Sequence, residues 1–300
     1  MENVISGWLC LDKPAGISSN AVLSHLKRIF KTRMGYIGTL DPFATGVLPV
    51  ALGEARKFIP YVNENKKTYI FKMIFGISTD SLDIDGEKNG ESDKIPSKNE
   101  LLSILKTFIG VQKQMPPKFS AIKINGRRAC DLVRQGNEIS LKEKEITVFS
   151  LDLISEALNT EKEAELQVVC SKGTYVRSLA RDIAEKLGTL AYVKSLRRIQ
   201  SGFFSVKNII SLEKLQKIED TSMRISFILP VESPLDGIPA LYVSEIEAKR
   251  LQDGLRISYD GQDILPSNVL VFDRKNSRFR GIGYISSDQT VKAVRMCSLI

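Results

Sequence analysis

Histidine and cysteine are scarce in this chain of 300 residues. There is one histidine, His25, and the four cysteines (Cys10, Cys130, Cys170 and Cys297) are far apart and form no C-x-x-C pair. A serine–histidine triad or a multi-histidine metal site therefore has little material to work with. The cysteine pattern indicates neither a zinc site nor a disulfide framework, and it fits a reducing cytosol. We expect no metal and no other cofactor.

Long hydrophobic runs are also lacking. No run of about 18 apolar residues occurs, and the N-terminal stretch MENVISGWLCLDKP has no basic segment followed by a long apolar one. We therefore expect a cytoplasmic protein with no membrane partner. Lys and Arg outnumber Asp and Glu by 43 to 35, a net charge of +8. This favours an anionic partner, with nucleic acid ahead of acidic lipid, because no basic amphipathic helix with an aromatic face is evident.

Periodicity predicts an alternation of strands and helices. WLCLDKPAG reads as a short strand, and Ser18 or Ser19 caps a helix whose buried stripe is Val22, Leu26, Ile29 and Phe30. KKTYIFKMIFG alternates as a strand with Tyr69, Phe71, Met73 and Phe75 on one face. We further expect helices in ALGEARKFIPYV and at 97–109, a hairpin turn at Asn125-Gly126, and strands at 146–155 and 164–170.

Basic residues gather in two places in the first half of the chain. Lys27, Arg28, Lys31 and Arg33 crowd the end of the first helix, where cations suit the helix dipole and could also meet phosphates. The segment 111–136 interleaves apolar residues with Lys118, Lys123, Arg127 and Arg128. This segment is the better candidate for contact with a nucleic-acid backbone, and a solvated basic face is the alternative.

The acidic stretch STDSLDIDGEKNG superficially resembles a calcium-binding loop, with Asp83, Asp85 and Gly86 at the third, fifth and sixth positions. Ser81 stands at the first position and Ser92 at the twelfth, so the bidentate glutamate is missing. We expect a solvated acidic turn rather than a metal site.

A lone carboxylate, Asp41, interrupts the otherwise uncharged stretch GYIGTLDPFATGVLPV. A buried, unpaired carboxylate costs several kcal/mol, so Asp41 must be solvated, hydrogen-bonded, paired with a cation or used in chemistry. Pro42 biases Asp41 toward an extended conformation in a stiff loop between Gly38 and Gly46. A plain Asp-Pro turn is the alternative.

A cation for Asp41 is available in SKGTYVRSLARDIAEKLG. Its helical stripe ends at Gly188, and Tyr175 and Arg177 fall where strand gives way to helix. Arg177 lies off the buried stripe, so it is either a surface residue or the partner of Asp41. In the next segment, YVKSLRRIQSGFF, Leu196 stands beside Arg197 and Arg198.

The composition changes near ILPVESPLDGIPAL, where prolines at 230, 234 and 239 indicate a linker. We expect two domains, 1–235 and 236–300. The second is small and mostly β, with a helix end at EAKRLQDG, a strand at NVLVFD and a turn at RFRGIG. Arg274, Lys275, Arg278 and Arg280 cluster around one of its hairpins.

The ordered set LDKPAGISS, GTLDPFATGVLPV, KTYIF, SKGTYVR and LRR resembles the bacterial tRNA pseudouridine synthase B family across essentially the whole chain. That family converts uridine 55 in the T arm of tRNA to pseudouridine. The resemblance implies an α+β fold, in which a mixed, mainly antiparallel sheet flanked by helices is followed by a small, mostly β domain similar to a PUA domain. It also implies tRNA as the partner, with the T stem-loop as substrate and no obligate protein partner. A monomer is the default expectation.

The resemblance also implies roles for individual residues. Asp41 matches the catalytic aspartate and Arg177 the arginine paired with it. Tyr69 matches the tyrosine that lies against the target base and is a candidate for proton transfer at C5, and Leu196 matches the apolar residue that packs on the base.

Four more positions match the binding site in the family. Lys13 and Pro14 match the floor of the pocket, and Tyr175 belongs to the same motif as Arg177. Tyr36 stands where family members commonly carry a histidine that contacts the RNA loop. A tyrosine there can stack and donate a hydrogen bond, but it cannot take a cationic or acid–base role at neutral pH.

The chemistry agrees with these residue types. Making pseudouridine breaks the bond from N1 to C1′ and rejoins the base through C5 without a redox change. One carboxylate can attack C1′, attack C6 or remove a sugar proton, and all three routes stay open. A guanidinium would orient that carboxylate with its planar fork. Two alternatives also remain: an enzyme acting on another tRNA or ribosomal RNA uridine, and a nonenzymatic tRNA-folding chaperone.

Overall fold

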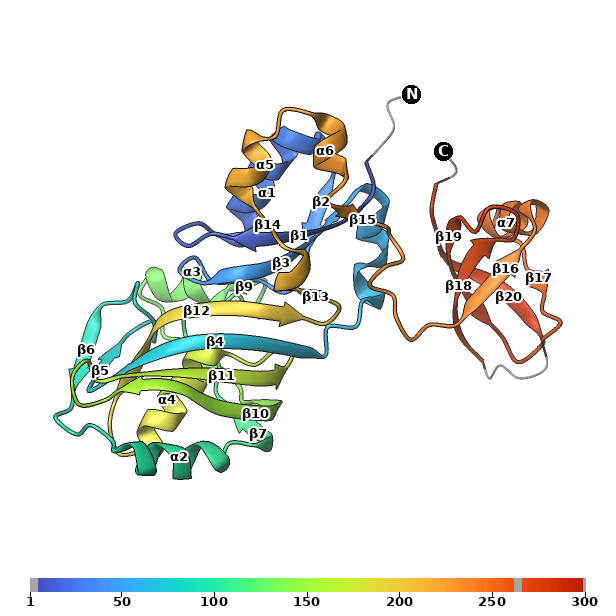
Figure 1. The fold of residues 1–300 in the computed structure, drawn as a ribbon. Helices are drawn as coiled ribbons and strands as arrows, with labels where there is room; N and C mark the ends of the chain where they lie inside the picture. The colour runs from blue at the N-terminus through green and yellow to red at the C-terminus, as the bar shows by residue number, and fades with distance from the viewer. Residues whose placement is uncertain (1–4, 262–265, 299–300) are drawn as a thin grey trace.

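The computed structural model describes residues 5–261 and 266–298, which form a large sheet with helices and a smaller β domain toward the C-terminus (Figure 1). Local signals place the first helix, α1 (Ser19–Phe30), as expected. The Ser18 side chain accepts a hydrogen bond from the backbone of Ala21 and so caps the helix. Val22, Leu26 and Phe30 are buried against the sheet, and Ile29 packs at the edge of the same core.

The 11-stranded sheet has the strand order β14-β1-β3-β12-β4-β11-β10-β7, with β2, β13 and β15 paired at its side. Its strands are β1 (Gly7–Lys13), β2 (Met34–Tyr36), β3 (Thr45–Leu52), β4 (Lys66–Phe75), β7 (Gly110–Gln114), β10 (Lys144–Ala157), β11 (Glu163–Ser171), β12 (Ala191–Ser201), β13 (Phe204–Ser205), β14 (Ile210–Ser211) and β15 (Ile228–Leu229). Only β1·β14 and β3·β12 are parallel among its described pairs. The expected mixed, mainly antiparallel sheet is confirmed.

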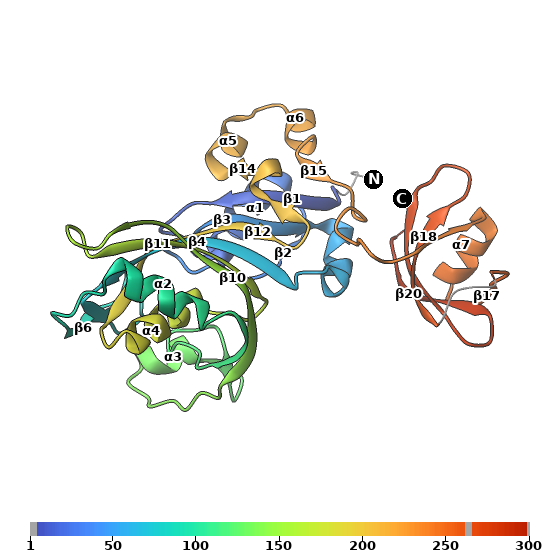
Figure 2. The same cartoon turned by 60° about the horizontal axis from the view of Figure 1, so that its bottom comes forward.

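The parallel pair β3·β12 joins two halves of this sheet through two residue pairs, Arg197↔Thr45 and Arg198↔Gly46. Helices α1, α5 (Leu212–Lys217) and α6 (Thr221–Ile225) lie over the half that contains β1 and β3 (Figure 1). The half that contains β4, β11 and β10 is covered by α2 (Lys98–Lys106) and α4 (Val176–Lys186), and α3 (Ala129–Arg134) lies beyond α4, as Figure 2 shows.

Short elements complete this part of the chain. They are α2 (Lys98–Lys106), α3 (Ala129–Arg134), α4 (Val176–Lys186), the 3-10 helices η1 (Gly53–Tyr61) and η2 (Val206–Asn208), and two hairpins, β5 (Ile77–Thr79) with β6 (Lys88–Glu91) and β8 (Lys123–Ile124) with β9 (Arg127–Arg128). The β8–β9 hairpin turns at Asn125 and Gly126, both with positive φ, as the sequence predicts. No helix in the described ranges is long and apolar enough to cross a bilayer.

Three sequence expectations need correction. The helix expected in ALGEARKFIPYV is present, but it begins only at Gly53, with φ +54°, as the 3-10 helix η1, because β3 continues to Leu52 by pairing with β1. RFRGIG is not a turn but the start of a strand in the C-terminal sheet. The acidic turn is solvated only in part, because Asp83 is buried.

The C-terminal β domain has the strand order β16-β18-β19-β20-β17. Its elements are β16 (Ala240–Val243), α7 (Glu245–Gln252), β17 (Ile257–Ser258), β18 (Ser267–Asp273), β19 (Phe279–Ile285) and β20 (Thr290–Met296). It packs on the first domain through a shared apolar cluster in which the Phe58 and Phe279 rings lie 5.2 Å apart. A mostly β second domain is confirmed, whereas its likeness to a PUA domain and the boundary at 235/236 stay predictions. Residues 262–265 and 299–300 of the expected domain lie outside the described ranges.

Candidate active site

The loop that carries Asp41 connects β2 to β3, and hydrogen bonds from Lys13 hold it in place. The buried Lys13 ammonium donates to the carbonyls of Pro14 at 2.8 Å, Pro42 at 3.0 Å and Ala44 at 2.7 Å. Burial lowers the pKa of Lys13 to about 8, and the nearby charge of Asp41 opposes that shift. Lys13 thus fixes the carbonyls on the C-terminal side of Asp41.

Two further contacts stiffen the N-terminal side of this loop. The Ser19 hydroxyl donates to the Leu40 carbonyl at 2.9 Å and accepts from the Leu40 amide at 3.0 Å. Gly38 adopts a φ of +67°, which favours glycine, and a Cβ there would lie 2.8 Å from Lys67 Nζ. The Asp41 side chain remains 34% exposed and is therefore accessible to a ligand although its backbone is fixed.

Arg177, in the first turn of α4, binds two carboxylates at once. Its Nε lies 3.0 Å from Asp41 Oδ2 and its Nη1 lies 3.0 Å from Asp83 Oδ2. The same guanidinium donates to the carbonyls of Ser81 at 2.8 Å and Phe119 at 3.0 Å. With only 4% of its side chain exposed, Arg177 is not a surface residue, and its orientation is fixed by four partners.

The second carboxylate, Asp83, comes from the acidic stretch before β6. Asp83 accepts from the Ser81 hydroxyl at 2.6 Å and from the Asp85 amide at 3.1 Å. Burial raises the pKa of Asp83, while the Ser81 hydrogen bond and the charge of Arg177 oppose the rise. Asp83 is therefore a structural partner of Arg177 rather than part of a solvated turn.

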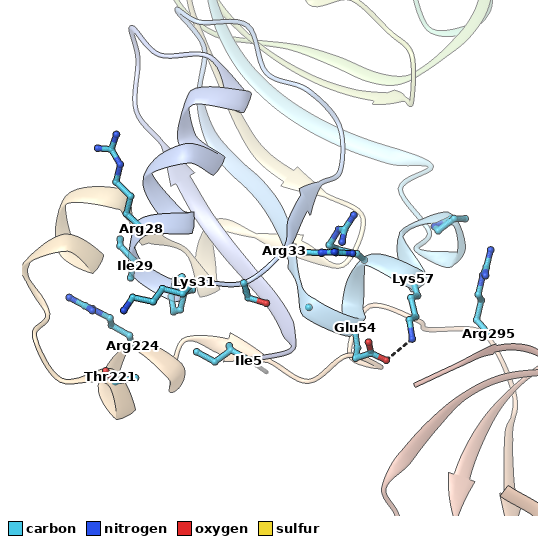
Figure 3. Close-up of a pocket in the computed structure, with 15 residues that line it drawn as sticks. Ile5, Arg28, Ile29, Lys31, Arg33, Glu54, Lys57, Thr221, Arg224 and Arg295 are labelled. Atoms are coloured by element: carbon cyan, nitrogen blue, oxygen red, sulfur yellow. Dashed lines mark hydrogen bonds and ion pairs between the residues drawn. The ribbon is translucent and has the colours of Figure 1, made fainter. Parts of the chain in front are cut away.

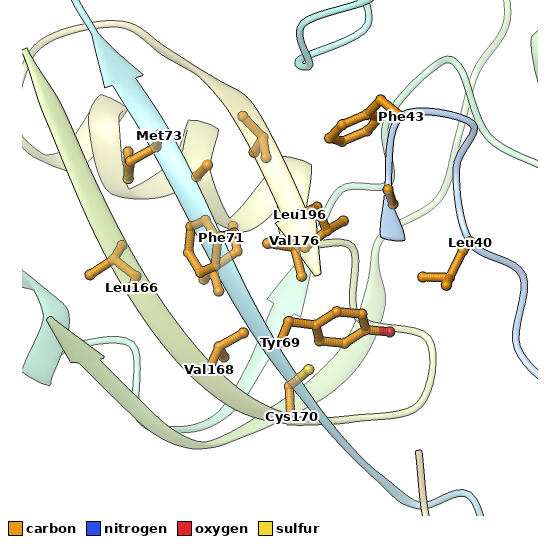
Figure 4. Packing of buried hydrophobic residues seen from close by; sticks show 14 of the residues in the cluster. Leu40, Phe43, Tyr69, Phe71, Met73, Leu166, Val168, Cys170, Val176 and Leu196 are labelled. Carbon is orange, nitrogen blue, oxygen red and sulfur yellow. The ribbon is translucent and has the colours of Figure 1, made fainter. Parts of the chain in front are cut away.

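Tyr69 and Leu196 form an apolar wall beside Asp41. Tyr69 lies on β4, where its cross-strand neighbour on β12 is Arg198. Figure 4 shows the Tyr69 ring between Val176 and Cys170, with its hydroxyl directed toward the loop of Leu40. Burial raises the pKa of Tyr69, opposed by the positive charge of Arg198. The phenol therefore stays protonated at neutral pH and can donate a hydrogen bond.

Five of the eight residues expected at the site line one cavity of about 260 Å³: Asp41, Tyr69, Tyr175, Arg177 and Leu196. Tyr175 is positioned by Gln114, whose side chain accepts from its amide at 2.8 Å and donates to its carbonyl at 3.1 Å. Burial raises the pKa of Tyr175 as well.

The other three expected residues lie outside that lining. Lys13 is beneath the loop, and Pro14 is exposed and offers its carbonyl to Lys13. Tyr36 is half-buried on β2, where it pairs with Val50 and packs against the main core. These positions leave the roles of Lys13 and Pro14 as supports and of Tyr36 as an RNA contact as predictions.

Sequence reasoning missed two residues, Asp83 and Arg198. Arg198 is completely buried and donates to the carbonyls of Val47 at 2.7 Å and Gly38 at 2.8 Å, so it ties β12 to β3 and to the turn before Asp41. Its neighbour Arg197 points to the other face and forms two 3.0 Å contacts with Asp12. Recognising the strand at 191–201 would have separated the two arginines, because alternate residues of a strand face opposite sides.

Metal ligands do not converge in this site. Across residues 5–261 and 266–298, no group of three or more His, Cys, Asp or Glu side chains is placed to hold a metal ion. What the cavity offers is an accessible carboxylate fixed by a guanidinium, a buried phenol and an apolar wall. This combination suits a carboxylate acting on a planar base that stacks between side chains.

Comparison with known proteins places the chain in a family. Residues 27–176 match the model of the TruB family pseudouridylate synthase N-terminal domain, and residues 177–236 match that of the tRNA pseudouridylate synthase B C-terminal domain. A Caulobacter vibrioides protein named tRNA pseudouridine synthase B is 42% identical over 85% of this chain and 82% of its own length. An Ehrlichia canis protein of that name is 42% identical over 98% of this chain and 94% of its own length.

A solved structure described as an H/ACA RNP bound to a substrate RNA containing 2′-deoxyuridine superposes with a TM-score of 0.69, at 21% identity, over 97% of this chain and 84% of that chain. At this identity the likeness concerns the fold alone. The two family models together cover most of the chain, and the two relatives match it over 82% and 94% of their own length. The chain therefore belongs to the TruB family of pseudouridylate synthases.

Proposed function

We propose that this protein is a tRNA pseudouridine synthase that converts uridine 55, in the T loop, to pseudouridine, with Asp41 as the catalytic carboxylate. Relatives named tRNA pseudouridine synthase B support the reaction class and the tRNA substrate. The observation that carries the residue assignment is the 3.0 Å contact between Asp41 Oδ2 and Arg177 Nε at the wall of the cavity. The T-loop position rests on the resemblance of the five sequence motifs to that family.

Asp41 supplies the reactive oxygen. The reaction breaks the bond between N1 and C1′, forms a bond between C5 and C1′, moves a proton off C5 and leaves one on N1. Asp41 acts either as the nucleophile, at C1′ or at C6, or as the base that removes a sugar proton. Arg177 holds Oδ2, and the stiff loop presents the carboxylate to the cavity in one orientation.

The cavity walls receive the target base after it leaves its stack. Unstacking costs a few kcal/mol, and contacts with Tyr69 and Leu196 offset it, since stacking is worth about 1 to 3 kcal/mol per base. The protonated Tyr69 hydroxyl can serve the proton transfer at C5. Structured RNA is recognised through its shape and phosphates, which agrees with the net charge of +8.

The reaction needs no redox partner and no external energy source, because substrate and product are isomers. We propose that the enzyme acts in the cytoplasm as a monomer, with tRNA as its macromolecular partner. Tyr36 would stack on the RNA loop in place of the histidine common in the family.

The decisive variant is Asp41→Asn, which keeps the size of the side chain and removes its charge. We expect pseudouridine formation in an unmodified T-arm minihelix to be lost while RNA affinity stays within a few-fold of wild type. Asp93→Asn is the matched control, since Asp93 is exposed and outside the cavity. Near-normal turnover by Asp41→Asn would overturn the catalytic assignment.

Mapping the modified position separates the alternatives. Pseudouridine in the T loop supports the proposal, whereas modification elsewhere in tRNA or in ribosomal RNA would assign another uridine. If wild type accelerates tRNA folding but forms no pseudouridine in any of these RNAs, the protein is a chaperone and the proposed activity is wrong.

A further inference from the structure

A hollow of about 1000 Å³ lies at the C-terminal end of α1. It is separate from the cavity that contains Asp41. Its walls come from the end of α1, from η1, from α6 and from β20 of the C-terminal domain (Figure 3). Seven cations line it: Arg28, Lys31, Arg33, Arg56, Lys57, Arg224 and Arg295.

The charge of this basic hollow is not balanced from within. Among its lining residues the one carboxylate is Glu54, which already pairs with Lys57 at 2.8 Å and accepts from the Ser298 amide at 2.6 Å. Seven cations and one carboxylate give the lining a net charge of +6. Within residues 5–261 and 266–298, none of the six other cations forms an ion pair. Such a concentration of like charge in a concave surface attracts anions.

A solvated helix end is the simplest alternative. Cations near the C-terminus of a helix are favoured by the helix dipole, and this accounts for Arg28 and Lys31. It does not account for Arg33, Arg56 and Arg295, which come from three other segments and converge on the same space. Nor does it account for Arg224, whose Nε is shielded from solvent without a hydrogen-bond partner. The convergence therefore favours an anionic ligand.

The position of the hollow favours a long ligand. Arg33 lies eight residues before Asp41, so their Cα atoms are at most about 29 Å apart. Strand β2, with Tyr36 in it, connects the two regions. A small anion would occupy a fraction of the 1000 Å³, whereas an RNA backbone carries a phosphate every few ångströms and could contact cations of both domains.

We propose that the basic hollow binds the phosphate backbone of the paired stem of the substrate RNA while the target loop reaches Asp41. The inference rests on the proposed function and adds a second contact region to it. Because phosphate contacts carry no sequence information, this region fixes the position and register of the RNA rather than selecting the uridine.

The test uses the double variant Arg33→Gln/Arg56→Gln in the full-length protein, which we call the pocket variant. Both side chains are exposed, so their loss leaves the core intact. The control is Lys98→Gln/Lys106→Gln, which removes the same charge from exposed positions on α2. The probes are an unmodified full-length tRNA transcript and a short T-loop hairpin with few base pairs. Binding is measured as a function of salt concentration.

For the full-length transcript we expect the pocket variant to bind at least about fivefold more weakly than the control. The plot of log K against log salt should become less steep by up to about 2, one for each lost phosphate contact. The short hairpin, which lacks most of the paired stem, should bind both proteins equally. Equal affinity and slope for pocket variant and control would overturn the inference. Equal loss for the short hairpin would also overturn it, since the effect would then be a general one of charge.

A calorimetric titration with inorganic phosphate separates RNA from a free anion. Saturable phosphate binding that disappears in the pocket variant, together with unchanged affinity for the transcript, would assign a small-anion site and overturn the RNA assignment. All of these readouts score binding alone. Failure of the proposed function would instead appear as absent pseudouridine in a transcript that the hollow still binds.

Discussion

At the scale of single residues, the shared use of Arg177 by Asp41 and Asp83 is the most consequential contact. Asp41 is accessible and can contact a ligand. Asp83 is buried, so its role is to position Arg177. A buried guanidinium that loses one charged partner is poorly compensated, and such a loss typically costs several kcal/mol. The orientation of Arg177, and through it that of Asp41, therefore depends on a residue outside the cavity lining.

We predict that Asp83→Asn lowers the free energy of unfolding by about 2 to 4 kcal/mol and lowers kcat at least about tenfold, with a smaller change in RNA affinity. Asp85→Asn, two residues away and exposed, should resemble wild type in both respects. Chemical unfolding and single-turnover kinetics measure the two effects. Wild-type kcat in Asp83→Asn would show that Arg177 keeps its orientation without the charge of Asp83.

Lys13 gives a prediction for pH. Its pKa is about 8 in the folded protein and near 10.5 when unperturbed, so between these values the unfolded chain binds more protons. The free energy of unfolding therefore rises with pH across this window, by on the order of 3 kcal/mol in total. Urea unfolding from about pH 7.5 to 9.5 should show this rise in wild type relative to Lys13→Met. A difference in the free energy of unfolding between wild type and Lys13→Met that stays constant with pH would contradict this prediction.

At the scale of elements, the contact between β3 and β12 depends on Gly46. Its φ is +101°, and a Cβ there would lie 2.2 Å from the Arg198 carbonyl oxygen, which is backbone and cannot give way cheaply. We predict that Gly46→Ala lowers the free energy of unfolding by at least about 3 kcal/mol, because steric overlap adds to backbone strain.

The matched control is Gly254→Ala. Gly254 has a φ of +82° with nothing within 4 Å of the added Cβ, so only the backbone strain of about 1 kcal/mol remains. Thermal and urea unfolding of the two variants should differ by the steric contribution. Equal destabilisation would mean that β3 shifts freely away from β12.

Elements with a strong local signal could be predicted from the sequence, and those set by distant contacts could not. The stripe of α1 and the alternation of β4 are visible within one segment, as is the motif around Asp41. Strand β12 carries charges on both faces, and it becomes a strand by pairing with β4 and β3. Asp83 can be buried because it pairs with Arg177, which lies 94 residues later in the sequence. Neither partnership leaves a local pattern.

At the scale of the whole molecule, the two domains share an apolar contact. Phe58 on η1 is completely buried, and its ring packs edge-on against Phe279 of β19. Lys57 donates to the Met296 carbonyl at 3.2 Å alongside. The C-terminal domain is thus held in place by more than the linker, and the basic hollow, which takes residues from both domains, depends on that contact.

We predict that Phe58→Ala lowers the free energy of unfolding by about 3 to 5 kcal/mol and speeds proteolytic cleavage in the linker at 230–239. Phe203→Ala, which removes a ring that is 41% exposed, should do neither. Thermal unfolding and limited proteolysis provide the measurements. Unaltered cleavage in Phe58→Ala would show that the domains are coupled by other contacts.

The narrow seam between the two halves of the large sheet divides the proposed machinery itself. Asp41 belongs to the β3 side, whereas Tyr69, Arg177 and Leu196 belong to the β4 and β12 side. Neither portion of the polypeptide holds a complete set of reactive groups, so turnover reports that both have docked in register. If the chain were cut at residue 63, between η1 and β4, each of the two fragments would be inactive. Mixing the fragments would restore isomerisation only as fast as they reassemble.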